Sequence, residues 1–578
     1  MGSKLNRLYP SWRAYKYLIF LIIPFIFYNS LFLNKAFHID DPFTIGIARA
    51  VNKNFINVPL EDKFTARIAE AIGEDFIDKP LVIGDNPLFM GYYYAPIIRF
   101  LGEQEVWLHL FFLPFSLLTI ISMYLLSLRF TGKSILPTLF LVLTPAFLLA
   151  SHNIMLDIPL LSFFLTALAA FIYGADRNNK RLLFLSIALA GIATLIKYSG
   201  FIVILLMFIY ALIFSKKRYC LLLTIPLSIF FLGIIHNIIF YKHAYFLSVL
   251  SLRLKEVSFI SRIPIRVFAC LSFITGTSII SLFLIPHLLR NKNNMFLMLL
   301  SLPVGLCPFL IKEPFIGYSN IERFSLAFLF TSSLFIIFVI VKLGLLSLFR
   351  KSYDKETLFL SLWFLISLVF IIPVLFIAAR FVLLLFPPMF LLIYKELTAN
   401  KIFFTPGLNK SVLASVLITV LISTILAIGD YHFAGAYRDF VTSLKKKPQF
   451  LDKEVYFCPA SYYPYLSWGY AYYLYKYYPA ILDIKISEDS DKMQDLIFIS
   501  PSEPVLPAVI NKVCSREFRD SDYDKNLIDR FCYKSSVVLQ NRRFHAGFYS
   551  HDWGLLPFYI SFRQAPLETF DVYSLSIR

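Results

Sequence analysis

Long apolar runs alternate with short polar connections along most of this chain. A helix needs roughly 20 apolar residues to cross a bilayer, and thirteen runs of about that length occur before residue 430. They cover residues 17–33, 106–128, 134–150, 154–173, 182–198, 200–214, 220–241, 266–289, 295–311, 324–347, 358–377, 380–395 and 411–429. The pattern therefore predicts a polytopic α-helical membrane protein with about thirteen transmembrane helices.

The tail of the chain has a different pattern. Short β-branched and aromatic runs flanked by turn residues predict strands there, for example in KEVYFCPAS, DLIFISP, SSVVLQ and TFDVYSLSI. We expect two domains. Residues 1–429 form a transmembrane module that includes the polar loop 34–105, and residues 430–578 form a small mixed α/β domain.

Basic residues indicate which side of the membrane each connection faces. Lys4, Arg7, Arg13 and Lys16 precede the first run, and every second connection after it is basic, from RFTGK to KELTANK. The connections SHN, YSG and AAR carry at most one basic residue. The positive-inside rule then predicts a cytoplasmic N-terminus, and an odd number of spans puts the tail outside.

Composition agrees with a membrane protein. The chain has 578 residues, 58% of them hydrophobic and 16% charged, and a mean hydropathy of +0.68, which excludes a soluble protein of this size. The formal net charge of +18 is attributed to basic loops at the membrane surface, so we expect membrane lipids and no nucleic acid as partners. The first run lacks a small-residue cleavage site and is interpreted as a retained anchor. Whether Cys458, Cys514 and Cys532 form a disulfide is left open.

Two acids stand just beyond the first span. Asp40 and Asp41, in AFHIDDPF, are predicted to lie outside the membrane, and Asp157 begins the fourth run on the same side. Asp41 before Pro42 is also a good helix start, so capping is an alternative role for it. Carboxylates at such positions are capped, paired or functional. His152 and Asn153 are interpreted as turn residues.

Two cations are predicted on that same side. Lys197 lies between two apolar runs and Arg380 opens the twelfth. Each alone could extend toward lipid headgroups. Together with the acids they suggest one site in which a carboxylate accepts a proton and the cations neutralise a phosphate, whereas the opposite side carries only scattered loop charges.

With these residues in view, the chain resembles the GT-C membrane glycosyltransferases, specifically relatives of the protein O-mannosyltransferases and the aminoarabinose lipid A transferases. The motifs occur in order: HIDDPFTIGIARAV, DNPLFMGYYYAPIIRFLGEQEVWLHL, TPAFLLASHNIMLDIPLLSFF, LAGIATLIKYSGF and ARFVLLLFPP. The tail pieces GDYHFAGAYRDF, YLSWGYAYYL and AGFYSHDWGLLPF are similar to the exterior domain of one bacterial branch.

The resemblance implies an inverting transfer from a polyprenyl-phosphate sugar to a hydroxyl acceptor at the exterior face of a bacterial plasma membrane. Asp40, Asp41 and Asp157 are the implied catalytic carboxylates, with Asp40 preferred as the base, and Lys197 and Arg380 are the implied ligands of the donor phosphate. No cofactor is implied, no residue pattern demands a metal, and a divalent ion is left open.

The loop that carries the second motif is expected to contact the acceptor through Asn86, Tyr92, Tyr93 and Tyr94, although an interfacial aromatic belt is the alternative for the tyrosines. Asn86 stands where relatives carry His, and Phe381 stands where they carry Tyr, which removes a hydroxyl from the expected phosphate site.

Two other functions remain alternatives. A flippase would move a lipid-linked sugar without breaking bonds, but transporters usually place ionisable residues near the membrane midplane. A non-catalytic scaffold with an exterior domain would leave the four charges unexplained.

Overall fold

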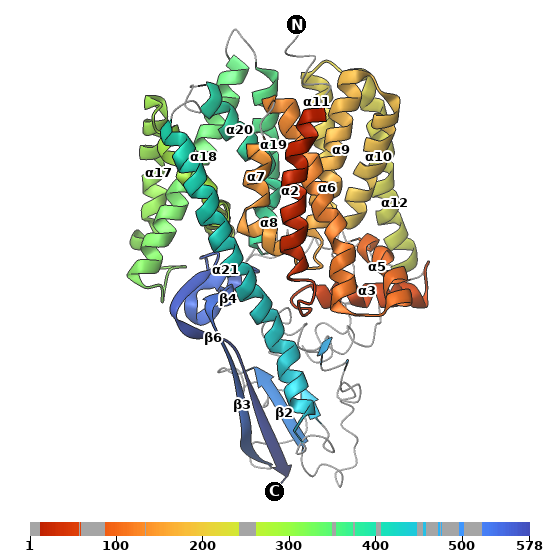
Figure 1. The fold of residues 1–578 in the computed structure, drawn as a ribbon, viewed down its shortest axis with the longest axis vertical. Helices are drawn as coiled ribbons and strands as arrows, with labels where there is room; N and C mark the ends of the chain where they lie inside the picture. Colours follow the sequence, from red (N-terminus) through yellow and green to blue (C-terminus); the bar gives the residue numbers. More distant parts are fainter. Residues whose placement is uncertain are drawn as a thin grey trace.

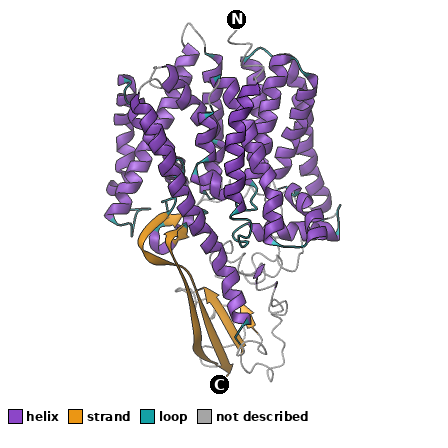
Figure 2. Cartoon of the chain, viewed as in Figure 1, coloured by secondary structure: helices purple, strands orange, loops and turns teal. Residues whose placement is uncertain are grey.

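The structure is a computed structural model that describes residues 12–56, 58, 87–132, 135–241, 262–349, 354–373, 376–399, 406–447, 455–457, 472–473, 476, 496–501 and 523–577. A broad bundle of helices forms most of the molecule, and a smaller β-structure projects from one end of it (Figure 1). Figure 2 shows that the described strands lie together at that end, with the last part of one long helix beside them.

The helices follow the apolar runs closely. Their bounds are α2 (Trp12–Ser30), α3 (Asp41–Lys53), α5 (Phe89–Leu101), α6 (Glu105–Thr131), α7 (Leu136–Val142), α8 (Pro145–Ala150), α9 (Asp157–Arg177), α10 (Lys180–Ile196), α11 (Phe201–Ile213), α12 (Thr224–Tyr241), α15 (Ile263–Gly276), α16 (Ile279–Leu288), α17 (Lys292–Leu310), α18 (Asn320–Phe349), α19 (Lys355–Ile371), α20 (Phe386–Ala399) and α21 (Pro406–Lys445). The 3₁₀ segments are η3 (Tyr198–Gly200), η4 (Lys217–Leu223), η5 (Ala379–Leu384), η10 (Arg542–Phe544) and η11 (His551–Trp553).

Each predicted run is helical, but several runs are broken. Among the described residues, six helices are long and apolar enough to cross a membrane, or seven if the bent pair α15–α16 counts as one span. That pair bends by 83°. The run 134–150 divides into α7 and α8 because Thr144 caps a new helix that starts at Pro145. The polytopic helical fold is confirmed, whereas thirteen complete crossings are not shown.

The end of the bundle far from the β-structure holds an ion-pair cluster. Arg129 contacts Asp176 at 2.8 Å and Glu356 at 2.6 Å, and Lys395 lies 3.2 Å from Glu356. The cluster joins α6, α9, α19 and α20 near the end of α9 opposite Asp157. The expectation of only scattered charges on that side was therefore wrong, because acids and bases on four helices that are distant in sequence meet near the helix ends.

The described strands of the tail form two sheets. The larger has the order β1–β2–β6–β3, with β1 (Val455–Phe457) parallel to β2 (Leu496–Pro501) and both other pairings antiparallel. The long strands β3 (Tyr523–Val538) and β6 (Tyr559–Ile577) pair Phe531 with Phe570. β4 (Gln540–Asn541) and β5 (Ala546–Gly547) form a short hairpin between them.

Helix α21 connects the bundle to the sheet without a break. It runs through the predicted boundary at residue 429, so no change of secondary structure marks that division. Near the C-terminal end of α21, the ring of Phe440 stacks on that of Phe570 with 4.2 Å between ring centroids. It meets the ring of Phe531 edge-on with 5.1 Å between centroids. These rings are a core shared by the helix and the sheet.

Candidate active site

Four of the predicted residues form one connected row of charges. Arg380 Nη2 donates to Asp40 Oδ2 at 2.6 Å, and Arg380 Nε lies 3.0 Å from Asp157 Oδ2. Lys197 Nζ donates to Asp157 Oδ1 at 2.9 Å. The row therefore alternates in sign, Asp40–Arg380–Asp157–Lys197. It begins at the N-terminus of α3, a helix at the end of the bundle that carries the β-structure (Figure 1).

Each member of the row stands at the end of an element, where a polar side chain can leave an apolar helix. Asp157 is the first residue of α9, and its charge suits a helix N-terminus. Lys197 follows the last residue of α10 in an extended conformation (φ −153°) and precedes η3. Arg380 is the second residue of η5 and is only 5% exposed.

The turn before α3 separates the two neighbouring acids. Ile39 has φ +50°, a left-handed conformation that is costly for a β-branched residue. Asp40 then occupies the N-cap position of α3, but its side chain makes no capping bond and instead meets Arg380. The Asp40 side chain keeps 36% exposure. This strained turn directs Asp40 toward the row of charges.

Asp41 points elsewhere. Its side chain is fully buried and accepts the backbone N–H groups of His38 at 3.1 Å and Ile154 at 2.8 Å. It thereby joins the turn before α3 to the hairpin before α9. The position of Asp41 favours a structural role over the catalytic role expected from the sequence.

The surroundings of Asp40 alter its acidity. Removal of the carboxyl group from bulk water raises the pKa of Asp40 above its usual value, and the neighbouring Arg380 guanidinium opposes this increase. Asp157 adds a repulsion that also raises the pKa of Asp40. A carboxylate in this setting is a better proton acceptor than one in water.

Phe381 lies between the two cations. Its ring centroid is 4.2 Å from Lys197 Nζ and 5.2 Å from Arg380 Cζ. An aromatic face at these distances stabilises a cation. The ring therefore helps to hold both cations in place without a hydroxyl group.

Sequence reasoning missed a second, buried cluster beside the row. Asp430 on α21 pairs with Lys35 and with His38 Nε2 at 3.1 Å, and it accepts the hydroxyl of Tyr549 at 2.6 Å. Asn153, interpreted as a turn residue, donates to the same hydroxyl at 3.1 Å. One signal was available: Asp430 is a lone acid at the end of an apolar run, and such acids are rarely without a function or a partner.

Hydrogen bonds connect the tail to the segment that carries Arg380. The backbone N–H of Ala379 donates to Phe548 O at 2.8 Å, and the N–H of His551 donates to Ile377 O at 2.9 Å. The N–H of Ile377 donates to His551 Nδ1 at 3.1 Å. Burial lowers the pKa of His551, which keeps the imidazole neutral and its Nδ1 able to accept.

The tyrosines of the predicted acceptor loop bond to backbone carbonyl groups and not to the row of charges. The hydroxyls of Tyr93 and Tyr94 donate to Phe111 O and Leu108 O of α6, at 2.8 Å and 3.1 Å, which is a packing role. Tyr92 donates to Phe55 O at 2.9 Å. Asn86 lies outside the described residues.

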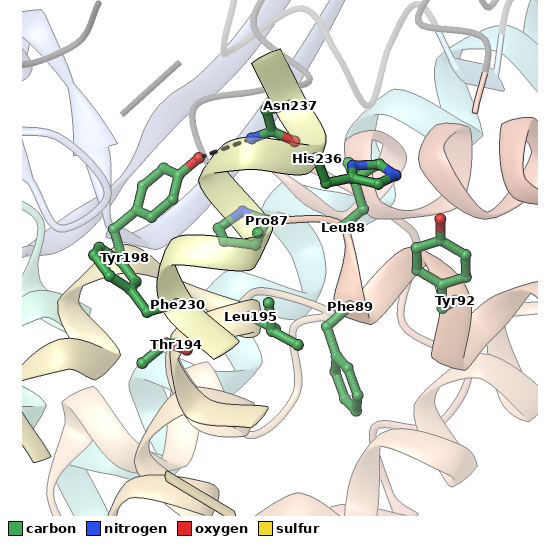
Figure 3. Close-up of a pocket in the computed structure, with 11 residues that line it drawn as sticks. Pro87, Leu88, Phe89, Tyr92, Thr194, Leu195, Tyr198, Phe230, His236 and Asn237 are labelled. Carbon is green, nitrogen blue, oxygen red and sulfur yellow. Dashed lines mark hydrogen bonds between the residues drawn. The ribbon is translucent and has the colours of Figure 1, made fainter. Parts of the chain in front are cut away.

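Tyr92 also lines a separate apolar cavity of about 220 Å³. Figure 3 shows this cavity among residues of α5, α10, η3 and α12, with Phe89 and Leu195 on its walls. Asn237 donates to the hydroxyl of Tyr198 at 3.3 Å at its edge. Tyr198 directly follows Lys197, so the cavity adjoins one end of the row of charges.

One of the three cysteines of the tail lies within the described residues. Cys532 is a free, exposed thiol, and Cys458 and Cys514 lie outside the described residues. Within the described ranges, no group of three or more His, Cys, Asp and Glu side chains is arranged to hold a metal ion.

Comparisons with known proteins give one family match. No curated protein sequence is significantly similar to the chain. Among solved structures, ArnT from Cupriavidus metallidurans in the apo state aligns over 97% of this chain and 98% of its own, with 11% identity and a TM-score of 0.39. The same protein bound to undecaprenyl phosphate aligns over 89% of this chain and 96% of its own, with 12% identity and a TM-score of 0.39.

The family match covers the middle of the predicted motifs. Residues 85–245 match the sequence model of the dolichyl-phosphate-mannose-protein mannosyltransferase family. This segment contains Asp157 and Lys197 and ends before Arg380. The match confirms, over that segment, the resemblance of this chain to the GT-C membrane glycosyltransferases.

Proposed function

We propose that this chain is an inverting glycosyltransferase that moves a sugar from a polyprenyl-phosphate donor to a hydroxyl acceptor at the exterior face of a bacterial plasma membrane. The observation that carries the proposal is the row Asp40–Arg380–Asp157–Lys197, which puts a partly exposed carboxylate next to one cation and a second cation further along the same row. The reaction needs a proton acceptor and a site for an anionic leaving group, and the row supplies both.

The reaction is a single displacement. The acceptor oxygen attacks the anomeric carbon as the bond from that carbon to the phosphate oxygen breaks, and the bonding electrons leave with the polyprenyl phosphate. The acceptor proton passes to Asp40, which acts late, when the attacking hydroxyl has become acidic. Arg380 and Lys197 stabilise the negative charge that develops on the phosphate.

Arg380 couples donor binding to the base. Its Nη1 is buried and has no hydrogen-bond partner among the described residues. This N–H group can therefore donate a hydrogen bond to a phosphate oxygen of the sugar donor. A phosphate that binds there competes with Asp40 for the guanidinium. Because the charge of Arg380 is what opposes the raised pKa of Asp40, donor binding makes Asp40 more basic at the moment a base is needed.

The lipid part of the donor fits the bilayer side of the site. The apolar cavity beside Tyr198 suits the isoprene units next to the phosphate, since its walls are mostly hydrocarbon and aromatic. In this proposal residues 1–429 are the transmembrane catalytic module and residues 430–578 are the exterior domain, as the basic loops predict.

Reconstitution tests the proposal directly. The full-length protein in liposomes is supplied with a radiolabelled polyprenyl-phosphate sugar and an envelope fraction as the source of acceptors. The expected result is a labelled product with inverted anomeric configuration and an equal amount of released polyprenyl phosphate. Movement of the donor across sealed vesicles without consumption would instead identify a flippase.

A further inference from the structure

A small cavity lies between Asp40 and two parts of the tail, the start of β4 and the segment that follows β5. Its volume is about 30 Å³, and it is lined on one side by Asp40 and Arg380 and on the other by Gln540, Tyr549 and Asp552. The proposed base therefore faces residues from the C-terminal part of the chain. Whatever meets the base must also meet these tail residues.

Gln540 is the unusual member of this cavity. It begins the β4–β5 hairpin, where it pairs with Gly547, and it is only 6% exposed. Its side-chain Oε1 is buried and has no hydrogen-bond partner within the described part of the chain. A buried carbonyl oxygen left without a donor costs about 1–3 kcal/mol, so such a group needs an explanation.

One carboxylate of the lining, Asp552, already accepts the Ser550 hydroxyl at 2.8 Å. The Asp40 carboxylate, which Arg380 meets through Oδ2, and Gln540 Oε1 are the two acceptors that a ligand can satisfy. The volume of the cavity suits roughly two water-sized groups, at about 10–15 Å³ for each. A serine or threonine side chain brings a single O–H donor and can satisfy only one of the two. A vicinal diol brings two O–H donors on adjacent carbon atoms. Two hydroxyl groups this close together can both fit in a cavity of this volume.

We infer that the acceptor is a sugar unit that enters this cavity with a vicinal diol. One hydroxyl of the diol donates a hydrogen bond to Asp40, and the neighbouring hydroxyl donates one to Gln540 Oε1. The hydroxyl on Asp40 is the nucleophile, and the hydroxyl on Gln540 orients it without reacting. The remainder of the sugar lies toward Trp553 and Phe376, whose aromatic rings line the same cavity and can pack against its carbon skeleton. This inference rests on the proposed function and narrows its acceptor class.

Acceptor competition in the full-length protein tests the inference. The donor is undecaprenyl phosphate that carries tritiated mannose, glucose or galactose, and the acceptors are methyl hexopyranosides, their monodeoxy analogues, and serine or threonine peptides. We expect transfer to the hexopyranosides. Removal of the hydroxyl next to the attacked position should raise KM for the acceptor at least tenfold.

A variant gives the reciprocal evidence. Gln540→Leu keeps the side-chain size but removes the amide, and it should raise KM for the intact hexopyranoside at least tenfold while KM for the donor stays as in the wild type. The deoxy analogue should show no additional loss in this variant, because both changes remove the same contact. Gln564→Leu is the matched control, because Gln564 is an exposed glutamine on β6.

Two outcomes would overturn the inference: peptides used as well as hexopyranosides, or a deoxy analogue used by the wild type as well as its parent. The deoxy comparison needs no variant, so it holds even if Gln540→Leu fails to fold. Failure of the wild type to cleave any donor, with every acceptor and with the envelope fraction, would contradict the proposed function itself.

Discussion

Asp40 and Asp41 are adjacent in the chain and yet have different surroundings. Asp40 faces Arg380, while Asp41 is buried against two backbone N–H groups. The sequence predicted that both acids matter, with Asp40 preferred as the base and helix capping as an alternative role for Asp41. It did not assign the direction of each side chain, because the left-handed turn at Ile39 depends on partners far along the chain, such as Ile154 and Asp430.

The acidity of Asp40 gives a prediction at this scale. A carboxylate base works only when deprotonated, so activity should fall as the pH drops through the pKa of Asp40, which burial raises. The acid limb of kcat/KM should therefore lie above about pH 3.9, the value for an aspartate in water. Arg380→Gln removes the positive charge that opposes the increase in the pKa of Asp40, so the acid limb of the residual activity should shift to higher pH. Arg380→Lys keeps the charge and should leave the limb near its wild-type position. A limb at or below that of a free aspartate would contradict this assignment.

At the scale of elements, the apolar runs predicted the helices well and their interruptions poorly. Hydropathy marks where a helix is apolar, but the bend between α15 and α16 and the break before α8 depend on local capping and packing. The 3₁₀ segments η3 and η5 matter most, because they follow Lys197 and hold Arg380. Both lie at the ends of the predicted runs 182–198, 200–214 and 380–395, where boundaries are least certain.

Gly200 makes the turn after Lys197 tight. A Cβ atom at this position would lie 2.2 Å from the carbonyl oxygen of Ala193, a backbone atom that cannot move aside. Gly200→Ala should therefore destabilise the protein by about 1–3 kcal/mol and displace Lys197, so thermal stability and sugar transfer should fall together. Gly435→Ala on α21 is the control, because its Cβ would lie 3.7 Å from Asp439 Oδ2, an ordinary contact. Equal behaviour of the two variants would show that the turn tolerates a side chain.

At the scale of the whole molecule, the tail and the bundle form a single site. The sequence predicted strands in the tail and its position on the same side as Asp40. It did not predict that residues 548–551 pair with the backbone beside Arg380, or that Tyr549 reaches Asp430. Contacts between segments more than a hundred residues apart leave no periodic pattern in a single sequence.

The hydrogen-bonded joint between residues 548–551 of the tail and residues 377–379 of the bundle can be tested through His551. In His551→Ala, the buried N–H of Ile377 loses its acceptor, which should cost about 1–3 kcal/mol and shift Arg380 away from Asp40. Thermal unfolding and the kcat for sugar transfer should both decrease. His551→Asn supplies a carbonyl oxygen in a similar place and should recover part of both. Wild-type kcat in the alanine variant would show that the joint does not position Arg380.

In the proposed reaction Asp40 takes the proton from the acceptor. The most direct measurement is sugar transfer from a labelled polyprenyl phosphate by Asp40→Asn, an isosteric change that removes the base, with Asp439→Asn on α21 as the control because that aspartate is 63% exposed. We predict that Asp40→Asn remains folded and loses transfer by at least a hundredfold, in line with the usual contribution of general base catalysis, while the control stays active. Full transfer by a folded Asp40→Asn protein would contradict the mechanism.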